Sequence, residues 1–384
     1  MNILQVVPEL NAGGVERTTI EIAQALSVAG HTPHVASAGG RLENELRGAG
    51  GVLHRLNVGS KNPLSLRANT KALIKLIKAH DIDLVHARSR APAWPARAAA
   101  KAANIPFITT YHGIYNANSR LKRRYNAIMA KGDMIIANSN FTKDHIIAEH
   151  ATPPAQITVI PRGVDMKLFD PGMESKADIK AMRAKWGVSG QRPVLLLPGR
   201  LTRWKGQLVG LNALALLPQK GFEAELVLLG DAQGRDEYVA ELEAEIARLK
   251  LGGLVHIAGH TNDMPCAYSS CDLVLSTSTD PEAFGRVAAE AQAMHKLVVA
   301  SAHGGALETV VDGETGFLVQ PGEPAYLAIA IANLLSKTVE ERLKMGIKAR
   351  ARIGREFSAD SLKTATLAVY EKAISAHKDH KLHN

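Results

Sequence analysis

Two cations of this sequence are spaced so that both could hold one polyanionic ligand. Arg200 and Lys205 lie in the segment Gly199–Gly206, directly after the apolar run Val194–Leu197. An arginine offers a forked contact to an anion and a lysine a point charge, so the two together suit a diphosphate. The segment is not a P-loop, because it lacks the Gly-Lys-Ser/Thr spacing. Taken alone, it would fit a basic surface loop equally well.

Two glutamates farther along the chain could bind hydroxyl groups of the same ligand. Glu282 and Glu290 enclose a Phe-Gly pair and follow the apolar run Leu273–Ser276. If a helix begins after Gly285, its free N–H groups suit phosphate oxygens, and both carboxylates can accept hydrogen bonds from sugar hydroxyls. Two glutamates at this spacing also occur on solvated helix faces, but the preceding strand and the Phe-Gly pair make the pattern specific.

Paired glycines follow the first apolar run, at Gly13 and Gly14. They would let a ligand approach the backbone where a helix begins, although a tight turn needs them too. A dinucleotide-binding fold would have Gly-x-Gly-x-x-Gly and an acidic residue at the end of the second strand. The sequence has neither, since its second run ends in Ala36–Gly40. This argues against an NAD-dependent dehydrogenase.

Buried parallel strands that alternate with helices would position these residues. Helical patterns such as Val15–Ala29 and Leu66–Ala79 separate short apolar runs in the first half, as expected for strands covered on both faces. The runs are Ile3–Val7, Pro33–Ser37, Leu84–Ala87, Phe107–Thr110, Met134–Ala137 and Ile157–Ile160. Repeated alternation of this kind predicts a doubly wound α/β sheet.

The alternation begins again after a linker at about 164–190. Helical segments such as Glu237–Leu249 and Arg286–Met294 separate the second series of runs, and residues 325–376 are almost all helical in pattern. The second series is Val194–Leu197, Glu225–Leu229, Val255–Ile257, Leu273–Ser276, Leu297–Ala300 and Phe317–Val319. The length is therefore explained by two sheets in tandem.

These patterns predict two Rossmann-like domains. The first would contain residues 1–165 with a returning C-terminal helix at about 360–384, and the second residues 166–359. Ligands of such sheets bind outside the carboxyl ends of the strands, so we expect the site in a cleft between the two facing domains.

Composition fits this organisation. The chain has 384 residues, 46% hydrophobic and 22% charged, which suits two globular domains better than one core. Cys266 and Cys271 lack partners at zinc-binding spacing, so we expect free thiols and a reducing, cytosolic compartment. The N-terminus has the pattern of a buried strand and not of a signal peptide, and no run approaches the roughly 18 apolar residues of a membrane span.

The net charge of +9 is confined to the first half. Residues 1–165 contain 20 Lys and Arg against 11 Asp and Glu, whereas residues 166–384 contain 26 of each. Solvated helix faces would explain the excess, and so would an anionic partner such as acidic lipid or nucleic acid. The helical segment 66–79 contributes cations opposite an apolar stripe that we expect to pack on the sheet. The densest cluster is Arg120, Lys122, Arg123 and Arg124.

With these motifs in this order, the chain resembles the retaining glycosyltransferases of family 4, which have the two-Rossmann architecture called GT-B. The resemblance covers nearly the whole chain, and the stretch Glu282–Met294 is also similar to proteobacterial envelope transferases, including lipopolysaccharide-core mannosyltransferases. It rests on Gly13-Gly14, Tyr111-His112-Gly113, Ala137-Asn138-Ser139, Val159–Asp165, Gly199-Arg200, Lys205-Gly206, Leu229-Gly230-Asp231, Gly259-His260, Glu282, Glu290 and Gly313–Val319.

The resemblance implies a donor site in the second domain. Arg200 and Lys205 would hold the donor pyrophosphate. Glu290 would bind the ribose and Glu282 the transferred sugar. The same site would include Phe284, Gly285, Arg286 and Val287.

It also implies roles for residues outside these two motifs. Thr261 and Asn262 would contact the nucleobase, and Gly14 would approach the phosphate and the acceptor. His112 would lie near the donor sugar, whereas without the resemblance an ordinary turn histidine is the better interpretation. The implied catalytic residues are His112, Glu282, Arg200 and Lys205.

The implied reaction is a front-face transfer, in which the leaving phosphate helps to take the acceptor proton while cations stabilise its growing charge. We expect no metal or other cofactor, because Arg200 and Lys205 serve in place of a metal and no Asp-x-Asp stands where a metal would bind.

GDP-mannose is the first choice of donor by resemblance, followed by UDP-glucose or UDP-N-acetylglucosamine. The expected acceptor is a lipid-linked or lipopolysaccharide-core glycolipid, and residues 120–124 would contact the anionic inner face of the cytoplasmic membrane.

Two other functions stay open at this point. A sugar-nucleotide epimerase shares the two-Rossmann fold, but the Phe-Gly pair between the glutamates argues against it. A nucleic-acid-binding protein would explain the basic half without requiring Glu282 and Glu290 in one site, so we expect no nucleic-acid partner. Salt-dependent binding to DNA would be the signature of that alternative.

Overall fold

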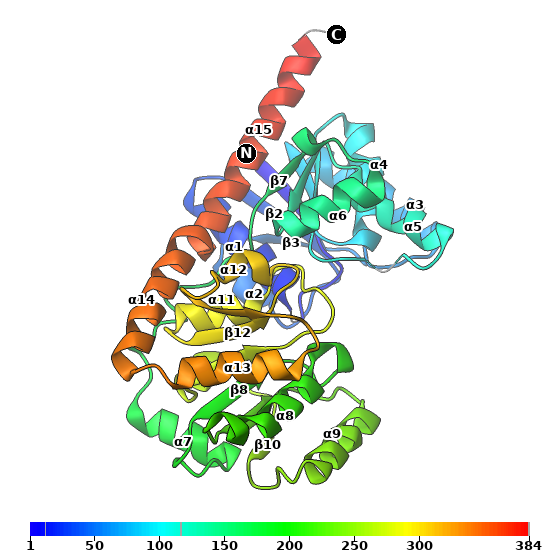
Figure 1. The fold of residues 1–384 in the computed structure, drawn as a ribbon. Helices are drawn as coiled ribbons and strands as arrows, with labels where there is room; N and C mark the ends of the chain where they lie inside the picture. Colours follow the sequence, from blue (N-terminus) through cyan, green and yellow to red (C-terminus); the bar gives the residue numbers. More distant parts are fainter. Residues whose placement is uncertain (12, 116, 383–384) are drawn as a thin grey trace. The chain divides into compact units, whose positions relative to one another are not determined.

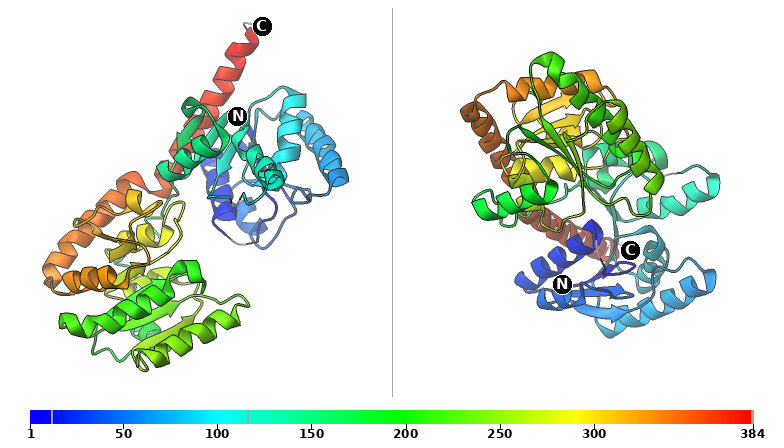
Figure 2. Two further views of the ribbon diagram at one scale, coloured as in Figure 1. Left: turned by 45° about the vertical axis from the view of Figure 1, so that its right-hand side comes forward. Right: turned by 90° about the horizontal axis from the view of Figure 1, so that it is seen from below.

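The computed structural model describes residues 1–11, 13–115 and 117–382, which belong to two compact units (Figure 1). Unit 1 contains Met1–Pro161 and Ala359–Asn384, and unit 2 contains Arg162–Ser358. Each unit is built on one parallel sheet with helices on both of its faces (Figure 2). The predicted pair of Rossmann-like folds is thereby confirmed, whereas the cleft between them stays a prediction.

The sheet of unit 1 has seven strands in the order β3-β2-β1-β4-β5-β6-β7. Its two faces carry separate cores, since Ile3 and Leu4 are both fully buried but belong to different hydrophobic clusters. The strands are β1 Asn2–Val6, β2 Thr32–Ser37, β3 Val52–Arg55, β4 Leu84–Ala87, β5 Phe107–Tyr111, β6 Met134–Ala137 and β7 Ile157–Val159. The helices are α1 Gly14–Val28, α2 Glu43–Gly48, α3 Pro63–Ala79, α4 Arg90–Ala103, α5 Arg120–Asn126, α6 Asn140–His150 and α15 Ala359–Leu382.

The sheet of unit 2 has six strands in the order β10-β9-β8-β11-β12-β13. Leu195 and Leu196 again lie in different clusters, one on each face. The strands are β8 Val194–Pro198, β9 Glu225–Leu229, β10 Val255–Gly259, β11 Leu273–Ser276, β12 Leu297–Ser301 and β13 Gly316–Val319. The helices are α7 Lys176–Trp186, α8 Gln207–Leu216, α9 Asp236–Arg248, α10 Met264–Ser269, α11 Arg286–Ala293, α12 Ala306–Thr309, α13 Pro324–Leu335 and α14 Val339–Glu356.

Each sheet has a topological switch point at its centre. In unit 1 it lies between β1 and β4, and in unit 2 between β8 and β11, because the chain moves outward in opposite directions from these paired strands. Ligands of doubly wound folds bind at the carboxyl ends of such strands. In unit 2 the segment Gly199–Gly206 follows β8 and the Glu282 segment follows β11. Both predicted motifs therefore stand at the position that the fold favours for a ligand.

The C-terminal helix α15 is part of unit 1 (Figures 1 and 2). Tyr370 is fully buried in the same cluster as Ile3. Its hydroxyl lies 2.7 Å from Nδ1 of His86, whose Nε2 lies 2.7 Å from Oγ1 of Thr110. Burial lowers the pKa of His86 well below its ordinary value, with a smaller effect from Arg88, so the ring is neutral. A hydrogen bond across 284 residues of sequence thus fastens the helix to strand β4.

The sequence patterns missed strand β3, and they assigned the region of helix α7 to a linker. The edge strand β3 has only partly buried or exposed residues, so it lacks the continuous apolar run by which the other strands were predicted. Helix α7 lies inside the predicted linker. It buries Trp186 as its one buried side chain among the described residues, and Ser175 caps its first turn. Both elements are held by their neighbours more than by their own hydrophobic pattern.

Three histidines pack together beside the edge of the unit 1 sheet. Nδ1 of His34 lies 2.9 Å from Nε2 of His54, and the ring of His80 lies about 5 Å from both rings. Burial, followed by repulsion from His54 and His80, lowers the pKa of His34 to about 4. Burial, followed by repulsion from His80, also lowers the pKa of His54.

Acid should therefore destabilise unit 1. The pKa of His34 is lower in the folded protein than the unfolded value of 6.5. Above pH 6.5 this difference does not change the free energy of unfolding, but as the pH falls from 6.5 toward 4 the free energy of unfolding decreases. For His34 we expect a loss of about 2 kcal/mol between pH 7 and pH 5. Urea unfolding of wild type and His34→Asn at the two pH values measures it. The variant should lose less than wild type, and His31→Asn, outside the cluster, should keep the wild-type difference; equal losses in all three would contradict this account.

Candidate active site

Close backbone contacts fix the loop that follows β8. A Cβ atom on Gly206 would lie 1.9 Å from the carbonyl oxygen of Thr277, and φ of Gly206 is +73°. A Cβ atom on Gly230 would likewise lie 1.9 Å from the carbonyl oxygen of Gly199. The Thr277 hydroxyl also donates to the Gly206 carbonyl at 3.0 Å. Glycines thus let the loop after β8 press against the ends of β9 and β11.

An ion pair joins this loop to the segment after β11. Nζ of Lys205 lies 2.7 Å from Oε1 of Glu282, and the two side chains are only 13% and 17% exposed. Ser278 donates its hydroxyl to the same carboxylate oxygen. The Lys205 ammonium also stands 4.5 Å from the centre of the Trp204 ring. The two residues expected to hold phosphate and sugar therefore meet at one point.

Arg200 presents its charge to solvent on a fixed backbone. Its carbonyl accepts a hydrogen bond from Nε2 of the buried Gln207 at 3.0 Å. The side chain is exposed, and within residues 1–11, 13–115 and 117–382 its guanidinium has no hydrogen-bond or ion-pair partner. An unpaired guanidinium and a partly buried ammonium in one loop are suited to an anion with several oxygens.

The turn before α11 also rests on close backbone contacts. Gly305 donates its N–H to the Glu282 carbonyl at 2.7 Å, and a Cβ on Gly305 would lie 2.3 Å from Cα of Phe284. Gly285 has a φ of +80° and begins the helix without a side-chain cap from the described residues. Gly285 therefore provides no side-chain cap for the first turn of α11.

Only the backbone of Phe284 is left for contact with a ligand. Its side chain is 4% exposed and lies in the core of unit 2, with its ring centre 5.8 Å from that of Phe357. The sequence placed Phe284 in the donor site without separating side chain from backbone. The structure assigns the ring to packing.

Glu290 is held by two partners within unit 2. Its Oε1 accepts from Nε and Nη2 of Arg286 at 3.1 and 2.6 Å, and its Oε2 accepts from the Tyr268 hydroxyl at 3.1 Å. Burial, followed by the Glu290 charge, raises the pKa of Tyr268 well above its ordinary value, so Tyr268 remains a donor. A carboxylate has about four acceptor positions, and three are used here. One position remains for a ligand hydroxyl.

Thr261 and Asn262 lie in the connection between β10 and α10. The Thr261 hydroxyl accepts from the N–H of Asp263 at 3.1 Å, and Oδ1 of Asn262 lies 3.0 Å from Nε2 of His260. No hydrogen bond among the described residues joins either side chain to Lys205 or Glu282. Their contact with a nucleobase stays a prediction.

The candidate residues of unit 1 follow its strands in the same manner. Gly14 begins α1 behind Gly13, whose φ is +132° and whose carbonyl accepts the Arg17 N–H at 3.1 Å. His112 directly follows β5, is partly buried, and accepts at its carbonyl a hydrogen bond from Asn138 at 3.1 Å. Both residues stand at carboxyl ends of strands, where the fold places ligands.

The four predicted surface cations lie on the short helix α5. Arg120, Lys122, Arg123 and Arg124 are all exposed. Arg123 is partly neutralised by Glu149, with Nε and Oε1 2.7 Å apart. The cations of α3 lie opposite Leu73, Leu76 and Ile77, which are buried against the sheet, so the expected packing of that helix is confirmed.

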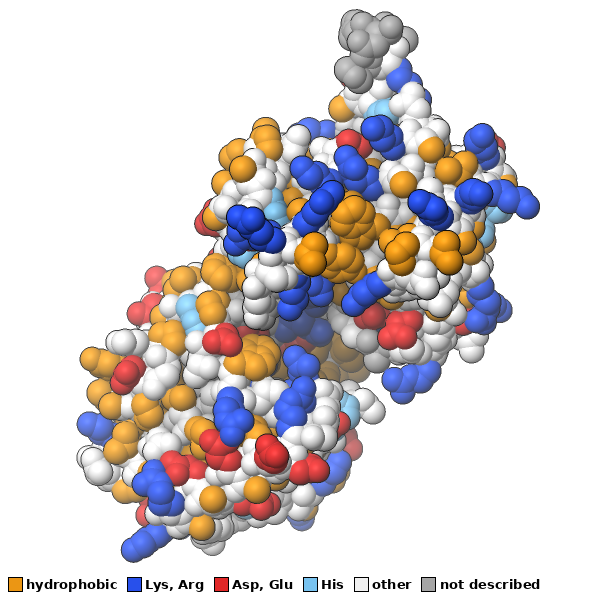
Figure 3. Space-filling model, turned by 90° about the vertical axis from the view of Figure 1, so that its right-hand side faces the viewer, with side chains coloured by type: hydrophobic (Ala, Val, Ile, Leu, Met, Phe, Trp, Pro, Cys, Tyr) orange, Lys and Arg blue, Asp and Glu red, His pale blue; other side chains and the backbone are white. Residues whose placement is uncertain are grey.

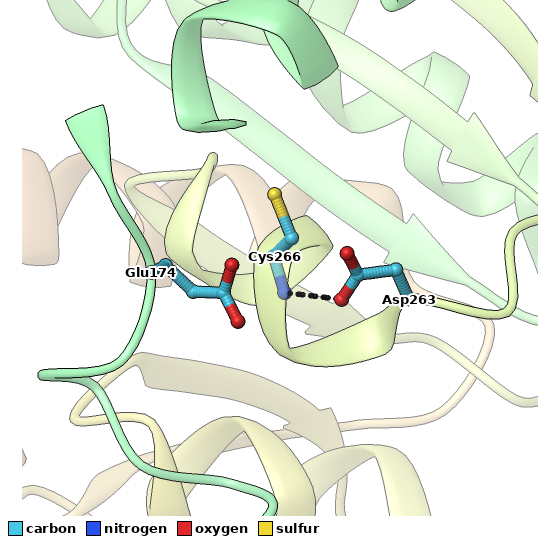
Figure 4. Close-up of side chains that lie close together, drawn as sticks. All are labelled: Glu174, Asp263 and Cys266. Carbon is cyan, nitrogen blue, oxygen red and sulfur yellow. Dashed lines mark hydrogen bonds between the residues drawn. The ribbon is translucent and has the colours of Figure 1, made fainter. Parts of the chain in front are cut away.

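One cluster of metal-ligand type occurs in the described part of the chain, formed by Glu174, Asp263 and Cys266 (Figure 4). Asp263 accepts the N–H of Cys266 at 3.1 Å and thereby caps α10. Burial, followed by the Asp263 charge, raises the pKa of the Cys266 thiol to about 11. Because Asp263 already serves as the cap of α10, we interpret the cluster as structural. The metal-free mechanism itself stays a prediction.

None of the helices described is long and apolar enough to cross a membrane.

Two family models match the chain in succession. The model described as Glycosyltransferase Family 4 matches residues 12–168, and the model described as Glycosyl transferases group 1 matches residues 178–352.

Known proteins resemble the chain over different spans. A glycosyltransferase from Rickettsia africae is 38% identical, with a TM-score of 0.89 over 97% of this chain and 98% of that one. The Anabaena protein HepE, solved with UDP, is 29% identical, with a TM-score of 0.81 over 97% of this chain and 100% of that one. A D-inositol 3-phosphate glycosyltransferase of Xylanimonas cellulosilytica is 34% identical over 64% of this chain and 58% of that protein. The chain therefore spans less than two thirds of the curated relative.

The close approach at Gly206 makes a testable prediction. Gly206→Ala should destabilise unit 2 by about 3 kcal/mol or more, because the left-handed backbone and the clash with Thr277 add together. Gly221→Ala is the matched control, since its φ is +80° but nothing lies within 4 Å of the added Cβ. The control should lose only about 1–2 kcal/mol. Urea unfolding compares the two, and equal losses would show that the loops are not tightly packed there.

Proposed function

The chain belongs to the family 4 glycosyltransferases, and from this premise we propose that it transfers a hexose, with retention of configuration, from a nucleotide-sugar to a lipid-linked acceptor. The observation that carries the proposal is the Lys205–Glu282 ion pair beside the unpaired Arg200 at the switch point of unit 2. It supplies two cations for a diphosphate and a carboxylate for sugar hydroxyls within one site.

Donor binding would exchange the partner of Lys205. Without a ligand the ammonium is neutralised by Glu282, 2.7 Å away. A diphosphate placed between Arg200 and Lys205 would take over that role and release the Glu282 carboxylate to accept hydrogen bonds from the transferred sugar. The uncapped first turn of α11 would add N–H groups to the phosphate oxygens.

The same groups would act in the chemical step. As the glycosidic bond to phosphate breaks, negative charge grows on the leaving diphosphate, and Arg200 and Lys205 stabilise it. The leaving oxygen accepts the proton of the acceptor hydroxyl, whose oxygen bonds to the anomeric carbon on the same face. Glu290, with one acceptor position left, would hold a ribose hydroxyl. The roles of Gly14 and His112 in unit 1 stay predictions from the family resemblance.

Two relatives bear on the choice of donor and of acceptor. HepE has been solved with UDP and with UDP-glucose, which favours a UDP-sugar over the GDP-mannose expected by resemblance alone. The relative that acts as a D-inositol 3-phosphate glycosyltransferase offers a second acceptor class, a polar inositol phosphate. A thermal-shift comparison of UDP, GDP and ADP identifies the base, because a ligand that binds only the folded state raises its melting temperature.

Loss of either cation should slow transfer. We expect Arg200→Ala and Lys205→Ala each to lower turnover at saturating donor by about 10²–10³-fold, as removal of a charged transition-state donor does. Arg203→Ala is the control, because Arg203 lies in the same loop but is exposed and paired with Glu241. Steady-state kinetics measures the turnover of the three variants. Wild-type turnover in Arg200→Ala or Lys205→Ala would refute the role assigned to that residue.

Activity should also survive metal removal. Because side chains would balance the leaving charge, an excess of EDTA should leave the transfer rate within about twofold of its untreated value. Complete loss of activity in EDTA, with recovery on addition of magnesium or manganese, would contradict the metal-independent mechanism.

The free cations of α5 should bring the enzyme to an anionic membrane. Each such cation contributes about 1 kcal/mol near an acidic surface, so a joint reversal of Arg120 and Arg124 to Glu should weaken binding to phosphatidylserine-containing vesicles by tenfold or more, on the order expected for two charges. Reversal of Lys75 and Lys78 on α3 is the matched control. Sedimentation with anionic and with zwitterionic vesicles measures the effect, and equal binding of the Arg120/Arg124 variant and wild type would exclude this surface.

A further inference from the structure

A pocket of about 670 Å³ lies in unit 1 between α3, α4 and α5. This side of unit 1 turns to the viewer in Figure 3, where Lys and Arg side chains surround a group of hydrophobic ones. Such a volume is typical of a small-molecule site. The residues that line it are Ser60, Lys61, Leu66, Arg90, Ala91, Trp94, Ser119, Leu121, Lys122 and Tyr125.

Aromatic rings form one wall of the pocket. The rings of Trp94 and Tyr125 are stacked with their centres 6.4 Å apart. Nε1 of Trp94 is buried, and no described residue accepts a hydrogen bond from it. Indole N–H groups usually find a partner when they are buried. This N–H is thus buried but unsatisfied by the described residues, and Trp94 and Tyr125 contribute their rings to the pocket lining.

Cations and exposed leucine surround these rings. Arg90 donates to Oδ1 of Asn126 at 2.8 Å and lies over the Tyr115 ring, 4.4 Å from its centre, so its position is fixed. Lys61 and Lys122 add two more charges, and no carboxylate is among the lining residues. Leu121 is 81% exposed, although its neighbours on α5 are polar.

The pocket lies at the edge of the unit 1 sheet where the candidate catalytic residue His112 stands. Helix α4 begins at Arg90, three residues after β4 ends at Ala87. Tyr115, on which Arg90 stacks, follows His112 by three residues. A ligand in the pocket would thus extend from the carboxyl ends of β4 and β5.

We propose that this pocket binds the acceptor as a lipid phosphate, with its apolar chain on Trp94, Tyr125 and Leu121 and its phosphate among Arg90, Lys61 and Lys122. The term acceptor rests on the proposed glycosyl transfer; the pocket chemistry does not. An inositol phosphate could use the cations but would leave the apolar wall uncovered, and an uncharged lipid would leave three cations without a counter-charge. Only an amphipathic anion matches both halves of the lining.

The experiment is calorimetric titration of the full chain with farnesyl phosphate, in parallel with farnesol, inorganic phosphate and inositol 3-phosphate. Farnesyl phosphate should bind at least about tenfold more tightly than each of the other three, because only it uses both halves of the pocket. Equal affinity for farnesol or for inositol 3-phosphate would overturn the proposal.

Substitutions in the pocket test whether farnesyl phosphate binds there. Leu121→Asp and Trp94→Ala should each weaken farnesyl phosphate binding by about tenfold or more. Trp94→Phe, which keeps one aromatic ring in the wall, should weaken it by a smaller factor. Leu64→Asp on α3 is the matched control, because Leu64 is 73% exposed and does not line the pocket. Wild-type affinity in Leu121→Asp would refute the site.

Titration with UDP-glucose separates this inference from the proposed function. Its affinity should be unchanged in the pocket variants, which also shows that they fold. If UDP-glucose binds and farnesyl phosphate does not, the lipid-phosphate pocket is wrong while glycosyl transfer stands. If farnesyl phosphate binds at this pocket but the chain transfers no sugar from any nucleotide-sugar, the pocket stands and the proposed function fails.

Discussion

The ion pair between Lys205 and Glu282 is the interaction on which the candidate site depends. It joins residues 77 positions apart, and it holds the loop after β8 against the segment after β11. The partial burial of this pair is important for stability. An exposed ion pair contributes little to stability, whereas removal of one partner from a buried pair leaves an unpaired charge that destabilises the protein. A diphosphate is the kind of ligand that can replace the carboxylate without such a cost. The pair is therefore both a structural link and the group that a donor must rearrange.

The backbone around this pair leaves little room for other arrangements. Gly206 meets the Thr277 carbonyl, and Gly305 meets the backbone of Phe284, so added side chains would displace the loops. Glycines also begin α8 and α11 without side-chain caps from the described residues. The close packing of the loops and the missing side-chain caps thus come from the same choice of residue. The sheet contributes by placing both loops at its switch point.

The sequence predicted most of the fold because buried parallel strands have continuous apolar runs. All twelve expected runs are strands, and only β3, an edge strand ending in His54 and Arg55, lacked the pattern. Helix α7 was missed because Trp186 is its one buried side chain among the described residues, so it lacks a clear apolar stripe. For the roles of Arg200, Lys205, Glu282 and Glu290 the sequence required a family resemblance, and these roles remain predictions.

Contacts between distant residues could not be predicted in this way. The i, i+4 spacing of Arg286 and Glu290 was a local signal for their ion pair. No such signal links Lys205 to Glu282, or brings Trp94 beside Tyr125, because both contacts arise only when separate strand ends meet. The burial of the Phe284 ring was similarly hidden, since a Phe-Gly pair at a helix start fits both a ligand contact and a core position.

The exchange of partners at Lys205 can be tested by one substitution with two opposed effects. Glu282→Gln removes the charge that competes with a diphosphate, and it also removes the carboxylate proposed to bind the sugar. The account predicts that UDP, measured by calorimetry, binds Glu282→Gln about three- to tenfold more tightly than wild type, because Lys205 is free for the phosphates. In the same variant, transfer from the nucleotide-sugar should fall by about 100-fold or more. UDP affinity that is unchanged or weaker in Glu282→Gln would contradict the account.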